Sequence, residues 1–475
     1  MKKHIVLLSL VPFFYYTNTY QVTDFGKLYP TQVNKIEYPA TIQEIQAIIK
    51  DAYKKKLTVS IAGVRHSQGG QSNSFHSINI DTKKFNKLLH IDKEQMIVKV
   101  QSGMTWKQLQ AILHPYDLSV GCMQASNIFT IGGSVSVNVH GRDPFLGPII
   151  DTVKSITIIN DRGNLVYADR HKNSELFYLA IGGYGLFGFI AEVELYVKKN
   201  CVCKRESHIL SYKEYPKYLI KHVLSNKDVQ LHYARLNTTP HKDFLKNLIS
   251  VEYIDQKIKV PETVLLDEKN ISFNQFFMQL YRKYWGRLTN SLRWVAEKYL
   301  TNPWEKVKVL TRNHAMSPYI HALANPGEGY TDLLQEYFIP LNSFNIFVES
   351  LASLSTKYHI KLLNVTLRWT PKNEESFLSY SKQDTVAFVL YFTCKMNDED
   401  LLDAKKFTID ITKVCLDVGG TFYLPYQRFA TKSQLLEAYS QLPEFMKKKK
   451  VYDSSSLFVS NWYKEYIQPL GYIKK

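Results

Sequence analysis

The chain has 475 residues, and its 60 Lys and Arg against 43 Asp and Glu give a formal net charge of +17 at neutral pH. Hydrophobic residues make up 45% and charged residues 22%, a globular composition that excludes a disordered chain, a collagen-like fibre and a small disulfide scaffold. The length predicts two or three domains. The positive charge suits nucleic acid, an anionic membrane surface or an anionic ligand, and charge alone does not choose among them.

Residues 1–20 begin with Met1-Lys2-Lys3-His4, followed by the mainly apolar run IVLLSLVPFFYY. This run is shorter than the roughly 20 residues of a spanning helix and is typical of a signal-peptide core or N-terminal anchor. Pro12 interrupts it and no A-x-A cleavage pattern follows, so the alternative is an apolar strand or helix packed on the fold. The expected location is exported or membrane-associated, with the cytoplasm as the alternative.

The five cysteines contain no Cys-x-x-Cys pair, so neither a zinc site nor a redox motif is predicted. Cys201 and Cys203 are one residue apart, which on a regular strand is a poor geometry for a mutual disulfide. Most of the cysteines are therefore expected to be buried as small apolar side chains.

Helices and strands mix over the first 200 residues. Thr41 and Glu44 have the spacing of a capping box, and the isoleucines that follow have helical periodicity. Further helices are predicted after Thr105 and from Ser174. Strands are predicted at 57–62, 78–81, 96–103, 155–160, 164–168 and 191–197. Two stretches rich in glycine and small polar residues, 63–77 and 124–141, interrupt this pattern.

After Cys203 the glycines become sparse and long amphipathic segments begin. Strands are predicted at 229–236, 335–340, 364–369 and 386–393, and helices at 274–300 and 398–417. The pattern predicts an α+β fold. Its parts are a domain at 30–200, a second α/β domain with an antiparallel sheet at 204–416, and a C-terminal segment at 419–475 that returns to the first domain.

Two loops carry candidate chemistry. In the first, IAGVRHSQGG at 61–70, small residues after a strand expose consecutive backbone N–H groups that can hold a pyrophosphate. In the second, TIGGSVSVNVHG at 130–141, glycines allow close backbone approach, and serine and asparagine side chains supply hydrogen bonds. Either loop taken alone is explained equally well as a structural turn.

Together with SELF at 174–177 and GGYGLFGFI at 182–190, these loops resemble the FAD-binding domain of the vanillyl-alcohol oxidase superfamily, which has the PCMH-type fold. The stretch from 130 to 195 looks particularly like that of decaprenylphosphoryl-ribose oxidase and of the sugar-lactone and alditol oxidases, and the subfamily is left open. The resemblance implies a two-subdomain FAD-binding domain at 30–200 and a substrate, or cap, domain after it. The cofactor-binding residues it implies are Ala62, Gly63, Val64, Arg65, His66, Ser67, Gln68, Ser126, Thr130, Gly132, Gly133, Ser136, Asn138, His140, Gly141, Ile190 and Tyr423.

His66 receives the most specific role from this resemblance. Its G-x-x-H-S loop is similar to the loop in alditol, aldonolactone and cytokinin oxidases whose histidine is bonded to the flavin 8-methyl group. That bond needs a neutral imidazole as nucleophile, a state available to histidine near neutral pH. The alternative is a histidine that only hydrogen-bonds phosphate or peptide. Ser126 stands where doubly linked relatives have a cysteine, so a second link is not expected.

The catalytic residues implied by the resemblance are Arg368, Tyr426 and His140. Arg368 matches the arginine of a Glu-x-Arg strand that stabilises negative charge on reduced flavin, with Thr366 in place of the glutamate. The alternative is a surface or salt-bridged arginine. Tyr426 stands where relatives have a lysine, and a phenol acts as a base only if a group such as Arg428 or His140 lowers its pKa. His140 matches a histidine beside the flavin, with a structural hydrogen bond as the alternative.

The expected protein is an FAD-dependent oxidoreductase that oxidises a hydroxyl-bearing carbon of a sugar-like, polyol or lipid-linked substrate. Hydride passes to flavin N5, and oxygen or another acceptor takes the electrons. The alternatives are a double-bond reductase of the same superfamily and a flavin- or lipid-binding protein without turnover. A nucleic-acid binder is suggested only by charge and is not expected. The aromatic and basic segment 274–300 is typical of an interfacial helix, so peripheral membrane contact is expected, with a core helix as the alternative.

Overall fold

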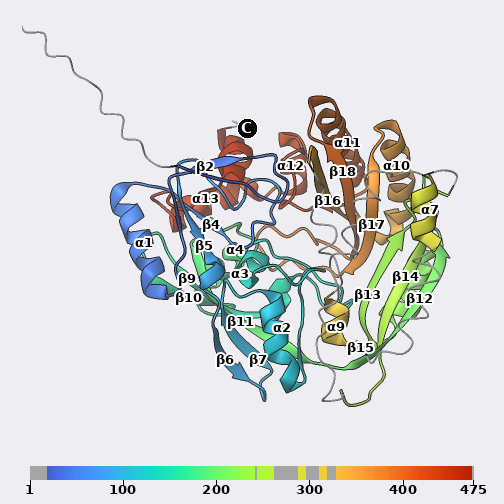
Figure 1. The fold of residues 1–475 in the computed structure, drawn as a ribbon, viewed down its shortest axis with the longest axis horizontal. Helices are drawn as coiled ribbons and strands as arrows, with labels where there is room; N and C mark the ends of the chain where they lie inside the picture. Colours follow the sequence, from blue (N-terminus) through green and yellow to red (C-terminus); the bar gives the residue numbers. More distant parts are fainter. Residues whose placement is uncertain (1–18, 241–242, 261–286, 296–309, 318–327, 473–475) are drawn as a thin grey trace, which may run out of the picture.

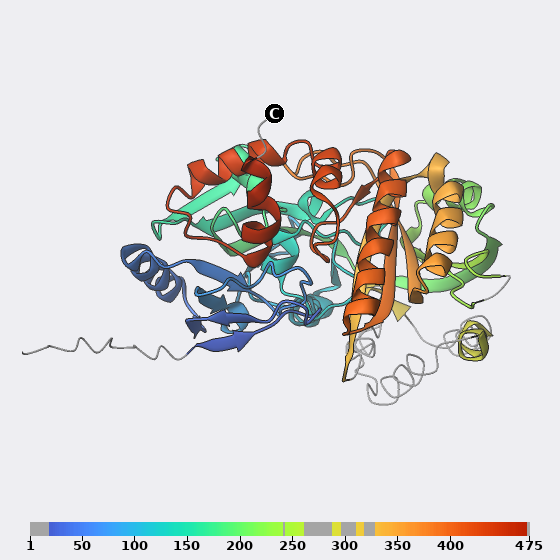
Figure 2. The same ribbon diagram turned by 90° about the horizontal axis from the view of Figure 1, so that it is seen from above.

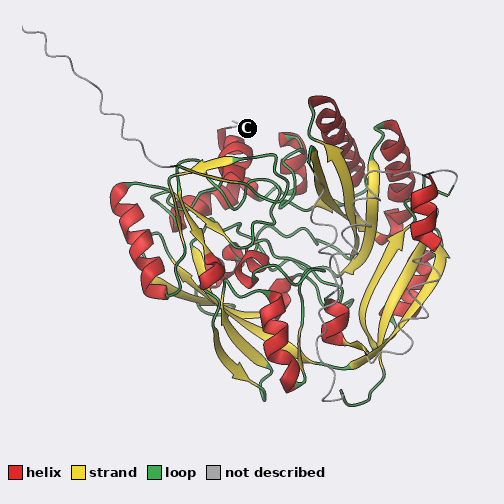
Figure 3. Cartoon of the chain, viewed as in Figure 1, coloured by secondary structure: helices red, strands yellow, loops and turns green. Residues whose placement is uncertain are grey.

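The structure, a computed structural model, describes residues 19–240, 243–260, 287–295, 310–317 and 328–472 (Figure 1). Residues 1–18 of the predicted signal segment and most of the predicted helix at 274–300 lie outside these residues. Helices and strands are mixed along the chain, and the large sheets are antiparallel, as predicted (Figure 3). None of the described helices is both long and apolar enough to cross a membrane.

A small parallel sheet and helix α1 (Ile42–Lys55) form the first unit. The predicted capping box is confirmed, because the Thr41 hydroxyl accepts a hydrogen bond from the Glu44 amide and the Glu44 carboxylate accepts one from the Thr41 amide. Ile45 and Ile49 on the inner face of α1 are fully buried. The sheet has the order β3 (Lys35–Glu37), β5 (Ile78–Asp81) and β4 (Val59–Ala62). The first glycine loop begins directly after β4.

A six-stranded antiparallel sheet forms the second unit. Its strands are β6 (Leu88–Asp92), β7 (Ile97–Gln101), β8 (Leu118–Val120), β9 (Val153–Ile159), β10 (Leu165–Asp169) and β11 (Phe189–Lys199). The long strand β11 pairs with β7, β8 and β9. Three helices contact strands of this sheet: α2 (Trp106–Leu113), α3 (Ile131–Ser136) and α4 (Ser174–Ala180). The second glycine loop contains α3, whose first turn includes Gly132 and Gly133.

An eight-stranded antiparallel sheet forms the third unit, with strand order β15-β12-β14-β13-β17-β18-β16-β19. Its strands are β12 (Val202–Ser211), β13 (Val229–Leu236), β14 (Asn247–Asp255), β15 (Leu310–Thr311), β16 (Tyr330–Pro340), β17 (Lys361–Thr370), β18 (Thr385–Lys395) and β19 (Thr421–Phe422). The strands predicted for this region are confirmed. Strands β12 and β14 were not predicted from the sequence.

Helices α10 (Phe344–Lys357) and α11 (Asp398–Asp417) lie side by side on one face of this sheet (Figure 2). Tyr337 of β16 and Phe388 of β18 pack against Phe347 of α10, with ring centroids 5.6 and 4.8 Å away. Side chains alternate along a strand, so the neighbours of these aromatic residues face the other way. The helices therefore leave one face of the sheet to meet the glycine loops.

The C-terminal segment runs back to the small parallel sheet. Its helices are α12 (Lys432–Ala438) and α13 (Leu442–Tyr452). After α13 the chain lies beside β4, where the Val59 amide donates to the Leu457 carbonyl at 2.7 Å and the Val459 amide donates to the Val59 carbonyl at 3.0 Å. Earlier in the segment the Gln68 amide donates to the Pro425 carbonyl at 3.3 Å. This last bond holds the chain around Pro425 against the first glycine loop.

Candidate cofactor and active site

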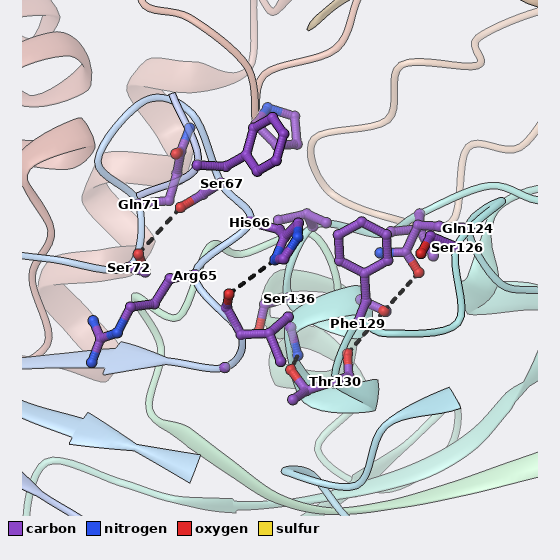
Figure 4. Close-up of a pocket in the computed structure, with 18 of the residues that line it drawn as sticks. Arg65, His66, Ser67, Gln71, Ser72, Gln124, Ser126, Phe129, Thr130 and Ser136 are labelled. Carbon is purple, nitrogen blue, oxygen red and sulfur yellow. Dashed lines mark hydrogen bonds between the residues drawn. The ribbon is translucent and has the colours of Figure 1, made fainter. Parts of the chain in front are cut away.

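A cavity of about 330 Å³ lies where the glycine loops face the open side of the eight-stranded sheet (Figure 4). Most of the predicted site residues line it, from both loops, from β11 and β17, and from the C-terminal segment. These are Gly63, Val64, Arg65, His66, Ser67, Ser126, Thr130, Gly132, Gly133, Ser136, His140, Ile190, Arg368, Tyr423 and Tyr426. The sequence reasoning missed other lining residues, among them Phe25, Ser102, Glu336 and Tyr391.

Four predicted cofactor contacts do not line the cavity: Ala62, Gln68, Asn138 and Gly141. The fully buried Gln68 accepts a hydrogen bond from the Leu334 amide of β16 at 3.0 Å and so ties the first loop to the sheet. The Asn138 side chain accepts one from the Ile150 amide at 3.2 Å. These side-chain oxygens are used within the protein, and direct cofactor contact by the four residues stays a prediction.

Arg65 anchors the first loop. It has a positive φ of 56°, and its guanidinium donates to Asn73 at 2.9 Å, to Asn79 at 2.6 Å and to Asp81 at 3.4 Å. Figure 4 shows this side chain pointing away from His66. The guanidinium is therefore occupied in holding the turn, while the loop as a whole forms part of the cavity wall.

His66 lies at the cavity wall between two phenylalanines. Its ring stacks on Phe25 with centroids 5.3 Å apart and meets Phe129 edge-on at 5.0 Å. His66 Nδ1 is 2.9 Å from the Val64 carbonyl oxygen. Phe25 comes from the N-terminal segment, and its amide donates to the Ser67 carbonyl at 3.0 Å. The orientation of the imidazole therefore depends on a residue about forty positions earlier in the chain.

One glycine of each loop occupies a backbone position that has no room for a side chain. A Cβ atom at position 63 would lie 2.2 Å from Thr130 Oγ1, and a Cβ atom at position 132 would lie 2.6 Å from the Cβ of Ser102. Thr130 is also the N-cap of α3, where its hydroxyl accepts a hydrogen bond from the Gly133 amide at 3.3 Å. Glycine at 63 and 132 is therefore required by close packing.

Gly63→Ala is expected to lower the FAD content of the purified protein strongly, because the new methyl group displaces Thr130 and separates the loops. The measurement is the ratio of flavin to protein absorbance, with the melting temperature as a check on folding. The double variant Gly63→Ala, Thr130→Ala removes the clashing hydroxyl and should recover part of the FAD content. Loss of the Thr130 cap should lower its free energy of unfolding by about 1 kcal/mol. Full FAD content in the single variant would contradict this packing argument.

Several buried polar atoms of the cavity residues lack a partner. Ser102 Oγ, Ser126 Oγ, His140 Nδ1 and Arg368 Nε form no hydrogen bond with any described residue. Buried polar atoms are normally satisfied, so a group of them around one cavity indicates a ligand rich in hydrogen-bonding groups. Together with the glycine positions that bring the two loops into contact, these atoms fit a large polar cofactor such as FAD.

His140 and Glu336 form a buried pair on the sheet side of the cavity. His140 Nε2 is 2.5 Å from Glu336 Oε1, and the two side chains are 4% and 3% exposed. The Tyr426 hydroxyl donates to the other carboxylate oxygen, Glu336 Oε2, at 3.2 Å. Sequence reasoning missed Glu336, although a carboxylate within the apolar strand QEYFIP is a usable signal, because a charge is rarely buried without a partner.

The electrostatics of this pair keep Glu336 ionised and Tyr426 protonated. Burial tends to raise the pKa of Glu336, but His140, Arg368 and the Tyr426 hydroxyl together hold that pKa below its usual value. Burial and the Glu336 carboxylate raise the pKa of Tyr426 well above its usual value. The condition for Tyr426 to act as a base is therefore not met.

The two groups suggested for lowering that pKa do not serve Tyr426. Arg428 forms an ion pair with Glu465 at 2.5 Å and lies 3.8 Å from the ring centre of Tyr29. His140 contacts Glu336 instead. Tyr426 is therefore a hydrogen-bond donor to the carboxylate.

Arg368 reaches the same cavity from β17. Its side chain is 9% exposed, and within the described part of the chain it forms no ion pair. The alternative of a salt-bridged surface arginine is thus excluded among the described residues. Its neighbour Thr366 accepts a hydrogen bond from Asn364 at 2.7 Å. A buried guanidinium with an unsatisfied Nε is suited to an anionic group on a bound ligand.

The sequence comparisons define the class of this site. Residues 34–169 match the family described as an FAD binding domain. These residues include both glycine loops, so this part of the chain matches an FAD-binding domain of the PCMH type. The resemblance implied by the loops is confirmed.

The curated relatives are enzymes of this superfamily. The chain is 28% identical over 222 residues to the mitochondrial L-galactono-1,4-lactone dehydrogenase of Arabidopsis thaliana, a match that covers 46% of the chain and 36% of the relative. It is 29% identical over 157 residues to the D-arabinono-1,4-lactone oxidase of Candida glabrata, covering 32% and 30%. It is 24% identical over 176 residues to the decaprenylphosphoryl-beta-D-ribose oxidase of Mycolicibacterium smegmatis, covering 37% and 38%. Each match spans less than half of these relatives.

Proposed function

We propose that the protein is an FAD-dependent oxidoreductase that oxidises the CH–OH group of a small sugar-like substrate. The observation that carries this proposal is the buried His140–Glu336 pair beside Arg368, in a cavity bounded by the two glycine loops. The similarity to lactone and sugar oxidoreductases supports the same chemistry. Oxygen or another acceptor is proposed to take the electrons.

Holding FAD is proposed for the two loops, with contacts from Gly63 to Ser67 and from Ser126 to His140. Ile190 and Tyr423 complete this set from β11 and the C-terminal segment. When bound, FAD supplies the acceptor for the hydride of the substrate carbon. His66 is proposed to attach the cofactor covalently, supported by the place of its ring at the cavity wall between Phe25 and Phe129.

The proton of the substrate hydroxyl is proposed to go to the His140–Glu336 pair. The Glu336 carboxylate favours the tautomer in which His140 carries its hydrogen on Nε2, so Nδ1 keeps a lone pair for the proton. Ionised Glu336 then balances the charge of the imidazolium. Tyr426 holds the second carboxylate oxygen and so fixes the orientation of Glu336. Arg368 places a positive charge where negative charge collects during reduction.

A lipid-linked substrate and membrane contact form a separate part of the proposal. They are supported by α7 (Arg287–Val295), where Leu288, Leu292 and Val295 are 73%, 61% and 49% exposed. These positions recur at helical spacing and give the helix an apolar side. An exported or membrane-associated location rests on the apolar run at 5–16. Co-sedimentation with anionic lipid vesicles tests the membrane contact.

The function is tested by flavin bleaching. The purified protein, or the protein reconstituted with FAD, is mixed without oxygen with sugar lactones, alditols and other polyols. Loss of the visible flavin absorbance with one of these classes, and its return with oxygen or a dye acceptor, is the expected result. A protein that stays colourless after reconstitution would refute the cofactor assignment. Bleaching by reduced nicotinamide alone would favour the double-bond reductase instead.

His66→Ala is expected to abolish covalent attachment while FAD binding persists, because the other loop contacts are unchanged. Acid precipitation gives the readout: flavin colour stays in the pellet for the natural chain and moves to the supernatant for the variant. Ser126→Ala is a matched control that should leave the colour in the pellet, since no second link is expected there. Pelleted flavin in the His66 variant would refute this linkage.

A further inference from the structure

Two cysteine thiols lie in contact where the chain passes from the six-stranded sheet to the eight-stranded sheet. The Sγ atoms of Cys201 and Cys203 are 3.6 Å apart. On a regular strand this spacing keeps the side chains apart, but Asn200 and Cys201 belong to neither β11 nor β12. At this break in the extended backbone the two sulfur atoms lie in contact, whereas the sequence predicted that they lie apart.

The two thiols differ in access and charge. Cys201 is half-buried and Cys203 is buried. The hydrogen bond between them lowers the pKa of Cys201, with Arg312 and Lys198 also favouring its thiolate against the effect of burial. The same hydrogen bond, together with burial, raises the pKa of Cys203. Cys201 is thus the thiol that solvent reaches, with Cys203 directly behind it.

The remaining cysteines have no such arrangement. Cys122, Cys394 and Cys415 are buried, and burial raises the pKa of each thiol. The backbone at the pair is held firmly, because the Arg312 amide donates to the Cys201 carbonyl at 3.0 Å and Cys203 pairs with Asp255 of β14. Thiolate character and access govern oxidation, so the five cysteines are expected to react very unequally.

We propose that Cys201 and Cys203 are a modification site, at which hydrogen peroxide oxidises the pair to a reversible disulfide. The Cys201 thiolate attacks one peroxide oxygen, the O–O bond breaks, and water leaves with a sulfenic acid on Cys201. The Cys203 sulfur then attacks that of Cys201, the S–S bond forms, the S–O bond breaks, and a second water leaves. Two thiols lose two electrons, and the peroxide is reduced to water. This step does not depend on the proposed FAD chemistry.

The test uses the full chain with added hydrogen peroxide. Trypsin cuts after Lys199 and Lys204 and releases both cysteines in the single peptide 200–204. After alkylation of free thiols, the expected product is this peptide without alkyl groups and lighter by two hydrogens, restored to the alkylated form by prior dithiothreitol. Peptides carrying Cys122, Cys394 and Cys415 should remain reduced. If peptide 200–204 stays alkylated at both cysteines while other cysteines oxidise, the proposal is wrong.

Variants separate the roles of the two thiols. Cys203→Ser should leave Cys201 as a sulfenic acid that dimedone labels, and Cys201→Ser should suppress oxidation of position 203. Cys394→Ser is the matched control and should form the same disulfide as the natural chain. Equal dimedone labelling in the natural chain and in Cys203→Ser would overturn the resolving role of Cys203. The peptide measurement on the natural chain decides the proposal even if a variant fails to fold.

Discussion

Glu336→Gln is expected to slow flavin reduction by substrate by a factor of about 10² to 10⁴, the range associated with a general base. The change keeps the size of the side chain but replaces one carboxylate oxygen with an amide donor. An amide N–H directed at His140 Nε2 favours the tautomer with hydrogen on Nδ1, which then cannot accept a proton. The measurement is the rate of anaerobic bleaching in a stopped-flow instrument with whichever substrate class reduces the natural protein.

Two further variants serve as controls for Glu336→Gln. Glu349→Gln changes a carboxylate of α10 that accepts a hydrogen bond from Tyr212 at 2.6 Å, away from the cavity, and should leave the rate unchanged. Tyr426→Phe removes one hydrogen bond to Glu336 but leaves its charge, so a smaller loss is expected. A natural rate of bleaching in Glu336→Gln, with normal FAD content, would remove the pair from the mechanism.

Arg368→Ala is expected to cost a factor of about 10² to 10³ in the same rate, the usual effect of removing one group that stabilises developing negative charge. The variant should also bind sulfite more weakly, because the sulfite adduct of flavin is anionic and gains from a nearby cation. Sulfite titration needs no substrate, so it tests Arg368 even while the substrate is unknown. Arg368→Lys keeps the positive charge but loses the planar guanidinium. Its bleaching rate and sulfite affinity should lie between those of Arg368→Ala and the natural protein.

Arg170→Ala is the matched control for charge. Arg170 is a partly exposed arginine paired with Glu375 at 2.8 Å, and it does not line the cavity. Its removal changes the net charge by the same amount and should leave sulfite affinity unchanged. Equal sulfite affinity in Arg368→Ala and the natural protein would show that this guanidinium does not act on the flavin.

Local patterns in the chain predicted much of the framework and the cofactor loops. The capping box at Thr41, the helix at 398–417 and the strand at 229–236 depend on neighbouring residues, so they are readable without tertiary information. The glycine loops are readable for the same reason, since a close backbone approach requires glycine whatever its partner is. The strands at 202–211 and 247–255 were missed because both carry polar residues that break the apolar pattern. In β14 Ser250 and Glu252 are buried within the sheet, whereas the polar residues of β12 stay at least partly exposed.

The composition of the active site depended on contacts between distant segments. Glu336 meets His140 across 196 positions in the chain, and no local pattern encodes that encounter. Burial and the charge of Glu336 decide that Tyr426 remains a donor, and packing of Phe25 orients His66. Cys201 contacts Cys203 at the point where the chain leaves β11 of the six-stranded sheet and enters β12 of the eight-stranded sheet. Residue types and spacing determine which groups are available, whereas burial and long-range pairing determine their partners, their protonation and hence their chemistry.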